Sequence, residues 1–240
     1  MEYLAIAAIG FIAFFLKGMT GTGTTTAIVG LSILIIDPKA AIVLASFVNI
    51  WGGLYMLRQD TTKLALKYWF PIAAAMMLGS ILGAYALKMI DSSIFNIVLG
   101  ITFVLIALFF LKPTQRMQPT ITPITASPLD NIIGAIAGFC GGFIGINAPV
   151  LVGYFGQALN KQYLRRLLVI IFIPAAIAQT ATFAVNGLLT KQIIFYGLAI
   201  LPAMIAGITC GNHLFQKISE ITFKRILAVF LFAMALKLLL

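Results

Sequence analysis

The feature that most constrains this chain is a set of long apolar runs. Residues 40–57, 94–111 and 221–240 each approach the roughly 20 residues that a helix needs to cross the hydrocarbon core of a bilayer. These runs are too long and too continuous for the strands of a membrane barrel. Helices also satisfy their own backbone hydrogen bonds, as lipid demands. The runs therefore predict an all-α polytopic membrane protein.

The composition agrees with this prediction. Of the 240 residues, 62% are hydrophobic and 9% are charged, whereas a soluble domain carries roughly 25% charged residues. The net charge of +10 does not indicate nucleic-acid binding, because the basic residues stand singly or in pairs in short loops between apolar runs. The N-terminus lacks the basic region of a cleaved signal, so we expect the first apolar segment to be retained.

Glycines recur in the same order in the two halves of the chain. At an offset of 124, Gly10, Gly18 and Gly21 match Gly134, Gly142 and Gly145; at an offset of 128, Gly79 and Gly83 match Gly207 and Gly211. We predict a first membrane repeat at 1–112 and a second at 131–240. The segment 113–130 between them is a polar, proline-rich linker that we expect to be cytoplasmic.

Each predicted repeat opens with an apolar segment that a glycine-rich stretch interrupts. Residues 3–36 surround the sequence KGMTGTGTTT at 17–26, and residues 131–159 surround CGGFIGINAP at 140–149. As a single helix, residues 3–36 would be about 51 Å long, far more than the roughly 30 Å thickness of the hydrocarbon core. They are also too few for two complete spans, which would need about 40 residues. Arms of about 14 and 11 residues fit a re-entrant hairpin with its tip inside the membrane. The alternative is a kinked single span.

The loop charges distinguish these two arrangements. Eight ordinary crossings divide the basic residues seven against eight, with no bias. Re-entrant openings divide them eleven against four. The larger group is Arg58, Lys63, Lys67, Lys112, Arg116, Lys161, Arg165, Arg166, Lys217, Lys224 and Arg225; the smaller is Lys39, Lys88, Lys191 and Lys237. The positive-inside rule then places the larger group in the cytoplasm and the N-terminus outside. Each repeat becomes a re-entrant hairpin plus three transmembrane helices, and the second repeat is inverted.

The two interruptions predict an anion site. Thr24, Thr25 and Thr26 precede an apolar run, and because threonine is a good N-cap we expect a threonine to cap a half-helix that starts here. Asn147 precedes Ala148 and Pro149, which is also a pattern typical of a helix start. Two half-helix N-termini would then direct free N–H groups and positive partial charges toward the middle of the protein. The alternative is that the glycines only permit close helix packing.

Lys17 lies far from either predicted membrane surface. All six acidic residues fall in expected loops or at helix ends, so a bound anion is a natural partner for the ammonium group. Alternatively, Lys17 reaches a membrane surface or caps a helix end. The matching position in the second repeat is Gly141. Asn49 and Gln179 lie inside corresponding helices, and they either line a cavity or join helices by hydrogen bonds.

The sequences GMTGTG at 18–23 and GFIGINAP at 142–149 resemble the interrupted helices of the sulfite exporter TauE/SafE family. The resemblance implies a multi-pass protein of the bacterial cytoplasmic membrane that transports a small sulfur-containing or organic anion, such as sulfite, sulfoacetate or another organosulfonate. Threonines replace several expected glycines, and Lys17, Asn147 and Ala148 depart from the family pattern. These departures leave the substrate open.

We therefore predict a secondary transporter that acts as an exporter, with a passive anion channel as the alternative. An enzyme is disfavoured, because the chain lacks a Gly-x-Ser-x-Gly motif, a zinc motif and a P-loop. No cofactor is expected; the expected partners are the anion, the lipid bilayer, a coupling ion (proton or sodium) and, as one option, a second copy in a homodimer. The expected substrate-binding residues are Lys17, Gly21, Thr22, Gly23, Thr24, Thr25, Asn49, Gly142, Gly145, Asn147, Ala148, Pro149 and Gln179.

Overall fold

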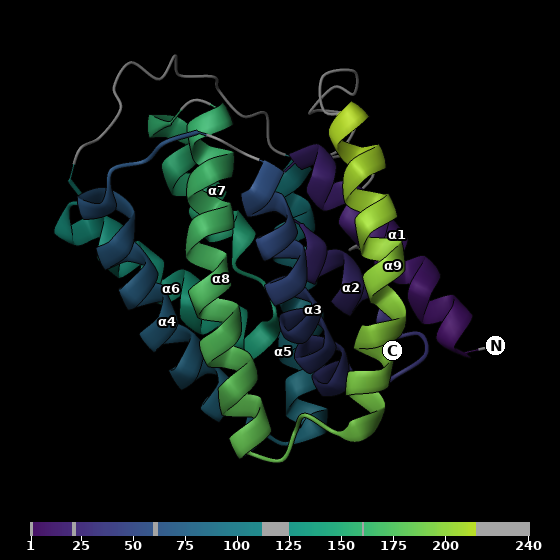
Figure 1. Cartoon of the computed structure of the whole chain (residues 1–240). Helices are drawn as coiled ribbons and strands as arrows, with labels where there is room; N and C mark the ends of the chain where they lie inside the picture. Colours follow the sequence, from purple (N-terminus) through teal and green to yellow (C-terminus); the bar gives the residue numbers. More distant parts are fainter. Residues whose placement is uncertain (1, 21–22, 60–61, 112–124, 160, 215–240) are drawn as a thin grey trace.

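A computed structural model describes residues 2–20, 23–59, 62–111, 125–159 and 161–214. These residues form the helices α1 (Glu2–Thr20), α2 (Thr24–Ser32), α3 (Pro38–Gln59), α4 (Leu66–Met89), α5 (Ser92–Leu111), α6 (Pro128–Ile144), α7 (Ala148–Ala158), α8 (Lys161–Val185) and α9 (Lys191–Leu214) (Figure 1). Among them, α1, α3, α4, α8 and α9 are long and apolar enough to cross a membrane. The prediction of an all-α polytopic membrane protein is confirmed. The apolar run at 221–240 lies outside the described residues.

Both predicted interruptions are present, but they are shorter than the sequence indicated. Helix α1 has 19 residues and α2 has 9, so the predicted arms of about 14 and 11 residues were wrong. Helix α1 continues through Gly18 because that glycine packs against a neighbouring helix. The second interruption likewise begins only after Ile144. Lys17 therefore lies within the last turn of α1 instead of at the tip.

Helix α6 begins at Pro128, inside the segment expected to be the linker. Ser127 is its N-cap: its hydroxyl accepts a hydrogen bond from the Asp130 amide at 3.1 Å, and the Asp130 carboxylate accepts one from the Ser127 amide at 2.8 Å. This reciprocal capping box and the proline at the first helical position define the start of the helix.

Two helix pairs have the most extensive contacts, α1 with α9 and α4 with α6. Glycines allow the close approach in each pair. A Cβ atom at Gly18 would lie 2.6 Å from the Ile208 carbonyl oxygen of α9, and one at Gly142 would lie 2.8 Å from the Ala84 amide nitrogen of α4. Larger residues would push the helix backbones apart at both places.

The two pairs use equivalent residues. Gly18 faces Gly211 and Asn212, whereas Gly142 faces Gly83 and Ala84. The α1 and α6 numbers differ by 124 and the α9 and α4 numbers by 128, which are the offsets of the glycine pattern. Each pair therefore joins the opening helix of one half to a later helix of the other half.

Hydrogen bonds show which helix ends lie together. At one end, Arg165 in the first turns of α8 donates to Asn212 near the end of α9 at 2.6 Å, and Arg166 donates to the Leu57 carbonyl of α3 at 3.2 Å. At the other end, Lys88 of α4 donates to Asn186, just after α8, at 3.3 Å. Arg165 and Arg166 thus share an end with Arg58, which is the grouping expected for re-entrant openings and not for eight crossings.

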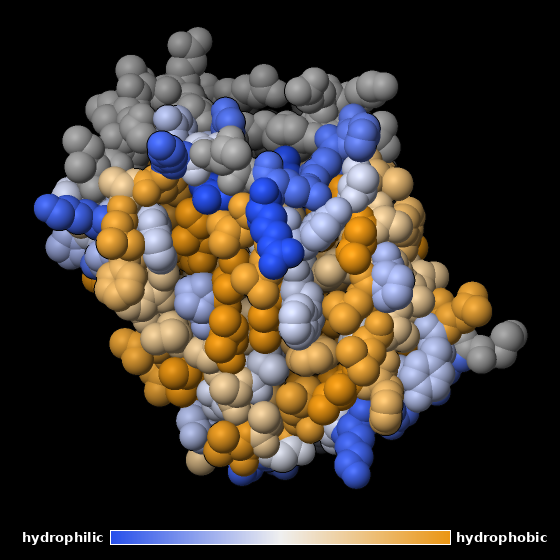
Figure 2. All heavy atoms as spheres, viewed as in Figure 1, coloured by the Kyte–Doolittle hydropathy of each residue, from blue (hydrophilic) through white to orange (hydrophobic). Residues whose placement is uncertain are grey.

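The outer surface suits a membrane protein. On the face shown in Figure 2, apolar side chains cover the middle, while hydrophilic ones gather toward the end where α8 begins and α9 ends. Large apolar residues of α4 and α9 are exposed on the helix surfaces, for example Leu78, Leu82 and Leu198. An exposed apolar surface of this kind fits contact with lipid.

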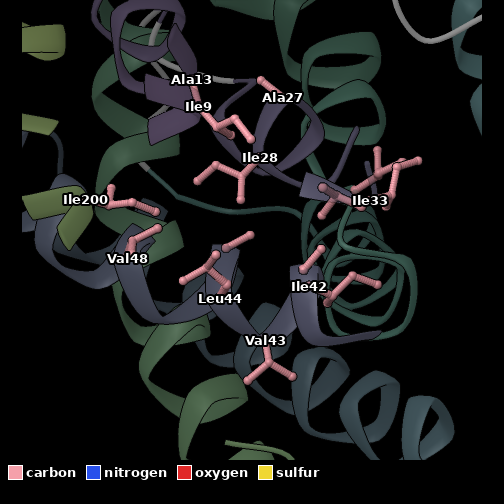
Figure 3. Close-up of a cluster of buried hydrophobic side chains, with 14 of the residues drawn as sticks. Ile9, Ala13, Ala27, Ile28, Ile33, Ile42, Val43, Leu44, Val48 and Ile200 are labelled. Carbon is pink, nitrogen blue, oxygen red and sulfur yellow. The ribbon is translucent and has the colours of Figure 1, made fainter. Parts of the chain in front are cut away.

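The short helix α2 lies inside the bundle, held by an apolar cluster. Figure 3 shows Ile28 of α2 among side chains from α1 and α3, including Ile9 and Leu44. Ile28 and Leu44 are both fully buried. This packing fixes the start of α2 next to α3, where the candidate site lies.

Candidate functional site

A small cavity lies between the two helix interruptions. One wall comes from α1, α2 and α3, and the other from the α6–α7 connection and α8. The lining residues are Lys17, Gly23, Thr24, Thr25, Thr26, Ser46, Asn49, Gly141, Asn147, Ala148, Phe172, Ala175, Ala176 and Gln179. Its volume is about 20 Å³, which is room for about one water-sized molecule. The two halves of the chain thus meet around a single polar space.

Lys17 is the buried cation of this cavity. Only 2% of the residue is exposed, and its ammonium nitrogen donates to Asn49 Oδ1 of α3 at 2.8 Å. The ammonium also lies 5.7 Å from the centre of the Phe14 ring, a geometry for a cation–π attraction. Among the described residues, no carboxylate pairs with Lys17. Glu2 instead accepts a hydrogen bond from Tyr196, and Asp130 belongs to the capping box.

The start of α2 forms part of the cavity wall. Gly23 is the N-cap residue, with φ of 87°, a left-handed conformation that glycine adopts without strain. The expectation of a threonine cap was therefore wrong, because the sharp entry into the helix requires glycine. The amides of Thr24, Thr25 and Thr26 belong to the first turn, where N–H groups have no partner within the helix.

The start of α7 has a related design. Asn147 is its N-cap residue and Pro149 lies in its first turn, as the sequence predicted. The Asn147 side chain makes no capping hydrogen bond, so its amide is not used to hold the helix end. Gly145, with φ of 74°, ends α6 and turns the chain toward α7. A Cβ at Gly145 would approach the methyl group of Thr25 at 3.4 Å, so the two interruptions are in contact.

Polar contacts of α3 and α8 complete the cavity wall. Gln179 Nε2 donates to the Gly141 carbonyl at 3.0 Å, and the Ser46 and Thr180 hydroxyls lie 2.9 Å apart. Gln179 therefore reaches the position that matches Lys17, just as Asn49 reaches Lys17 itself. Both options considered for these two residues are realised: they line the cavity and they join helices.

The structure brings together most of the predicted site residues. Those that line the cavity are Lys17, Gly23, Thr24, Thr25, Asn49, Asn147, Ala148 and Gln179. Gly142, Gly145 and Pro149 lie beside it: Gly142 packs against α4, Gly145 forms the turn, and Pro149 starts α7. Gly21 and Thr22 lie outside the described residues.

Six lining residues were not among the predicted site residues, namely Thr26, Ser46, Gly141, Phe172, Ala175 and Ala176. Gly141 had a usable signal, since it matches Lys17 in the repeat alignment. Phe172, Ala175 and Ala176 surround Pro174 inside α8, and nothing in their apolar sequence indicates which side of α8 faces the cavity.

The arrangement is suited to binding an anion. It combines a buried ammonium group, hydroxyl groups and the first turns of two helices, and none of the described residues that line it is a carboxylate. Helix N-termini favour negative charge through their free N–H groups and their partial positive charge. A fully buried cation without a carboxylate partner is costly, and a bound anion would offset that cost.

Comparison with known families agrees with this geometry. A family model described as sulfite exporter TauE/SafE matches residues 6–238, nearly the whole chain. The matched region contains both helix interruptions and every residue that lines the cavity. No curated protein and no solved structure matches the chain.

Proposed function

The chain belongs to the sulfite exporter TauE/SafE family, a family of membrane transporters, and from this premise we propose that it is a secondary transporter that exports a small sulfur-containing anion. The anion binds between the starts of α2 and α7. The observation that carries the proposal is Lys17, which faces this cavity 2% exposed, with an amide oxygen as its hydrogen-bond partner instead of a carboxylate.

The cavity volume supports a compact substrate. At about 20 Å³, the space is close to that of one water molecule. To admit sulfite, the starts of α2 and α7 need to move apart by only a small distance. Sulfoacetate and longer organosulfonates need these two helix starts to move farther apart. We therefore propose sulfite or an anion of similar size as the preferred substrate, with affinity that falls as the organic group lengthens.

The glycine contacts support two inverted repeats. Exchanging the halves of the chain converts the α1–α9 contacts into the α6–α4 contacts, as a twofold axis would. A repeat with three full crossings and a re-entrant opening has an odd number of crossings, so its copy has the opposite orientation. Such a pair supports two mirror-related conformations, one open to each side of the membrane.

We propose that the end of the bundle that holds Arg58, Arg165 and Arg166 is cytoplasmic, in a bacterial inner membrane, with the N-terminus outside. A cysteine at Lys63, in a chain without Cys140 and Cys210, should resist an impermeant thiol reagent in intact cells. A cysteine at Ser93, an exposed residue at the opposite end, is the matched control and should react. Both should react after permeabilisation. Ready labelling of the cysteine at position 63 in intact cells would show that the protein has the opposite orientation.

Transport is proposed to depend on a proton or sodium gradient. Because the lining residues in the described part of the chain include no carboxylate, we propose that the coupling ion binds backbone carbonyl groups or enters as the proton of the substrate itself. Assembly as a homodimer is compatible with the proposal and is not required by it.

The experiment that tests the function is sulfite uptake into proteoliposomes. A transporter gives saturating flux and counterflow, in which unlabelled sulfite on one side accelerates entry of labelled sulfite from the other. A channel of the same architecture gives flux that rises linearly with concentration and shows no counterflow. Absence of any sulfite or sulfonate flux, with correctly folded protein, contradicts both functions.

A further inference from the structure

Two consecutive hydrogen bonds join Lys17 to the start of α2, and chemistry fixes their direction. Lys17 Nζ donates to Asn49 Oδ1 at 2.8 Å, and Asn49 Nδ2 donates to Thr25 Oγ1 at 2.8 Å. An ammonium group only donates, so the Asn49 amide must turn its oxygen toward Lys17. The NH₂ group of Asn49 then necessarily faces Thr25.

This direction determines the role of the Thr25 hydroxyl. Its oxygen already accepts a hydrogen bond from Asn49, so its own proton must point elsewhere. No described residue accepts a hydrogen bond from Thr25, and Thr25 lines the cavity beside Lys17 and Asn49. The hydroxyl proton is therefore available to an acceptor in the cavity, and hydrogen bonds in series strengthen one another.

Ser46, another hydroxyl of the cavity wall, is oriented differently. Two acceptors lie within reach of its proton, the Val43 carbonyl at 3.3 Å and the Thr180 hydroxyl at 2.9 Å. Its proton is thus committed to the protein. Two hydroxyls of the same cavity have different roles because their neighbours are different.

We propose that Asn49 is a positioning residue for substrate: it fixes the direction of the Lys17–Asn49–Thr25 chain so that the Thr25 hydroxyl donates to an oxygen of the bound oxyanion. This inference rests on the proposed function and adds a specificity element to it. The site selects ligands that accept hydrogen bonds at two points, the Lys17 ammonium and the Thr25 hydroxyl, which is a property of oxyanions.

The decisive variant is Asn49→Asp, which nearly preserves shape and reverses the direction. A carboxylate accepts from both neighbours, so it pairs with Lys17 and draws the Thr25 proton toward itself. The cavity then loses its positive charge and its hydroxyl donor although Lys17 is still present. Equilibrium binding of radiolabelled sulfite to purified protein in nanodiscs should weaken by roughly 100-fold or more, because two charge-assisted interactions of about tenfold or more each are lost.

A matched pair of variants tests the hydroxyl directly. Thr25→Val removes the donor and keeps the shape, so sulfite binding should weaken by about tenfold. Thr25→Ser keeps the hydroxyl and should bind sulfite as the parent does. Thr102→Val removes a hydroxyl of α5 that donates to the Val98 carbonyl at 2.7 Å, outside the residues that line the cavity, and should also retain the affinity of the parent. Thermal unfolding of each variant controls for folding, and the threonine pair suffices if Asn49→Asp does not fold.

The outcomes separate this inference from the proposed function. If the parent protein binds sulfite and Thr25→Val binds it equally tightly, the proposed role of Thr25 and Asn49 is overturned while the anion site stands. Unchanged binding by a folded Asn49→Asp has the same meaning. If the parent binds neither sulfite nor a sulfonate, the proposed function fails and the inference fails with it.

Discussion

At the first helix interruption, Asn49 of α3 accepts a hydrogen bond from the ammonium group of Lys17. At the second, Gln179 of α8 donates a hydrogen bond to the backbone carbonyl of Gly141, the position that matches Lys17. The two interruptions thus share a design in which a central helix supplies an amide side chain to the end of the opening helix. They differ in that only one carries a charge. A Cβ at Gly141 would lie 3.1 Å from Asn147 Nδ2, a tight contact, so a side chain there would require Asn147 to shift.

On the proposed function, we therefore expect one anion for the whole protein instead of one for each proposed repeat. A second lysine would place two cations around a cavity of about 20 Å³, where their repulsion is weakly screened. In this proposal, the first half of the chain supplies the charge, and the second half supplies the start of α7 and a neutral polar wall. The predictions below test whether the repeats are equivalent in packing and different in binding.

The largest effect on stability is expected at the glycine contacts. Gly18→Ala and Gly142→Ala should each destabilise the protein by about 1–3 kcal/mol, because the new methyl group meets backbone atoms of a neighbouring helix. Gly156→Ala is the control, since a Cβ there makes ordinary 3.7 Å contacts. Thermal unfolding in detergent measures the three. A loss at one position only would show that the two repeats do not pack equivalently.

Gln179→Leu should have a smaller effect, mainly on stability. It removes the hydrogen bond to the Gly141 carbonyl, worth about 0.5–1.5 kcal/mol, but that carbonyl keeps the Gly145 amide as a donor at 3.1 Å. Gln162→Leu, at an exposed position of the same helix, is the control. If Gln179→Leu instead leaves stability unchanged and abolishes sulfite binding, the second amide binds substrate, and the two half-sites are more alike than we propose.

The smallest effect is expected for Asn147→Leu. Because the Asn147 side chain makes no capping hydrogen bond, the substitution removes only a polar part of the cavity wall. Sulfite binding should weaken by about two- to tenfold, the value of about one neutral hydrogen bond, with little change in the unfolding temperature. Affinity equal to that of the parent would remove the second interruption from the site.

Much of this arrangement could be predicted from local sequence, because local rules govern it. Apolar run lengths gave the membrane helices, and the Asn147–Ala148–Pro149 pattern gave the start of α7. The capping box of Ser127 and Asp130 was also readable, since Ser-Pro-Leu-Asp is a helix-start pattern. It was assigned to the linker because the repeat boundary was placed by the glycine matching and by the polar, proline-rich composition of this segment.

The remainder depends on contacts between distant residues. Gly18 has a low intrinsic helix propensity, yet α1 continues through it because α9, nearly 200 residues away, packs there. Gly142 was expected at the site because it belongs to the second glycine-rich stretch, but it packs against α4 at the α4–α6 contact. Whether Ser46 or Phe172 faces the cavity depends on the rotation of α3 and α8, which apolar helices of this kind do not encode in a simple pattern.

The central claim is that Lys17 provides the charge for the only anion site between the two interruptions of the described chain. The direct test is equilibrium binding of radiolabelled sulfite to the parent and to Lys17→Met in nanodiscs, with Lys88→Met as a control that removes a lysine from the end of α4. We predict one sulfite per parent chain, affinity weakened by roughly ten- to a hundredfold in Lys17→Met, and no change in Lys88→Met. Equal affinity of Lys17→Met and the parent, with both folded, would contradict the account.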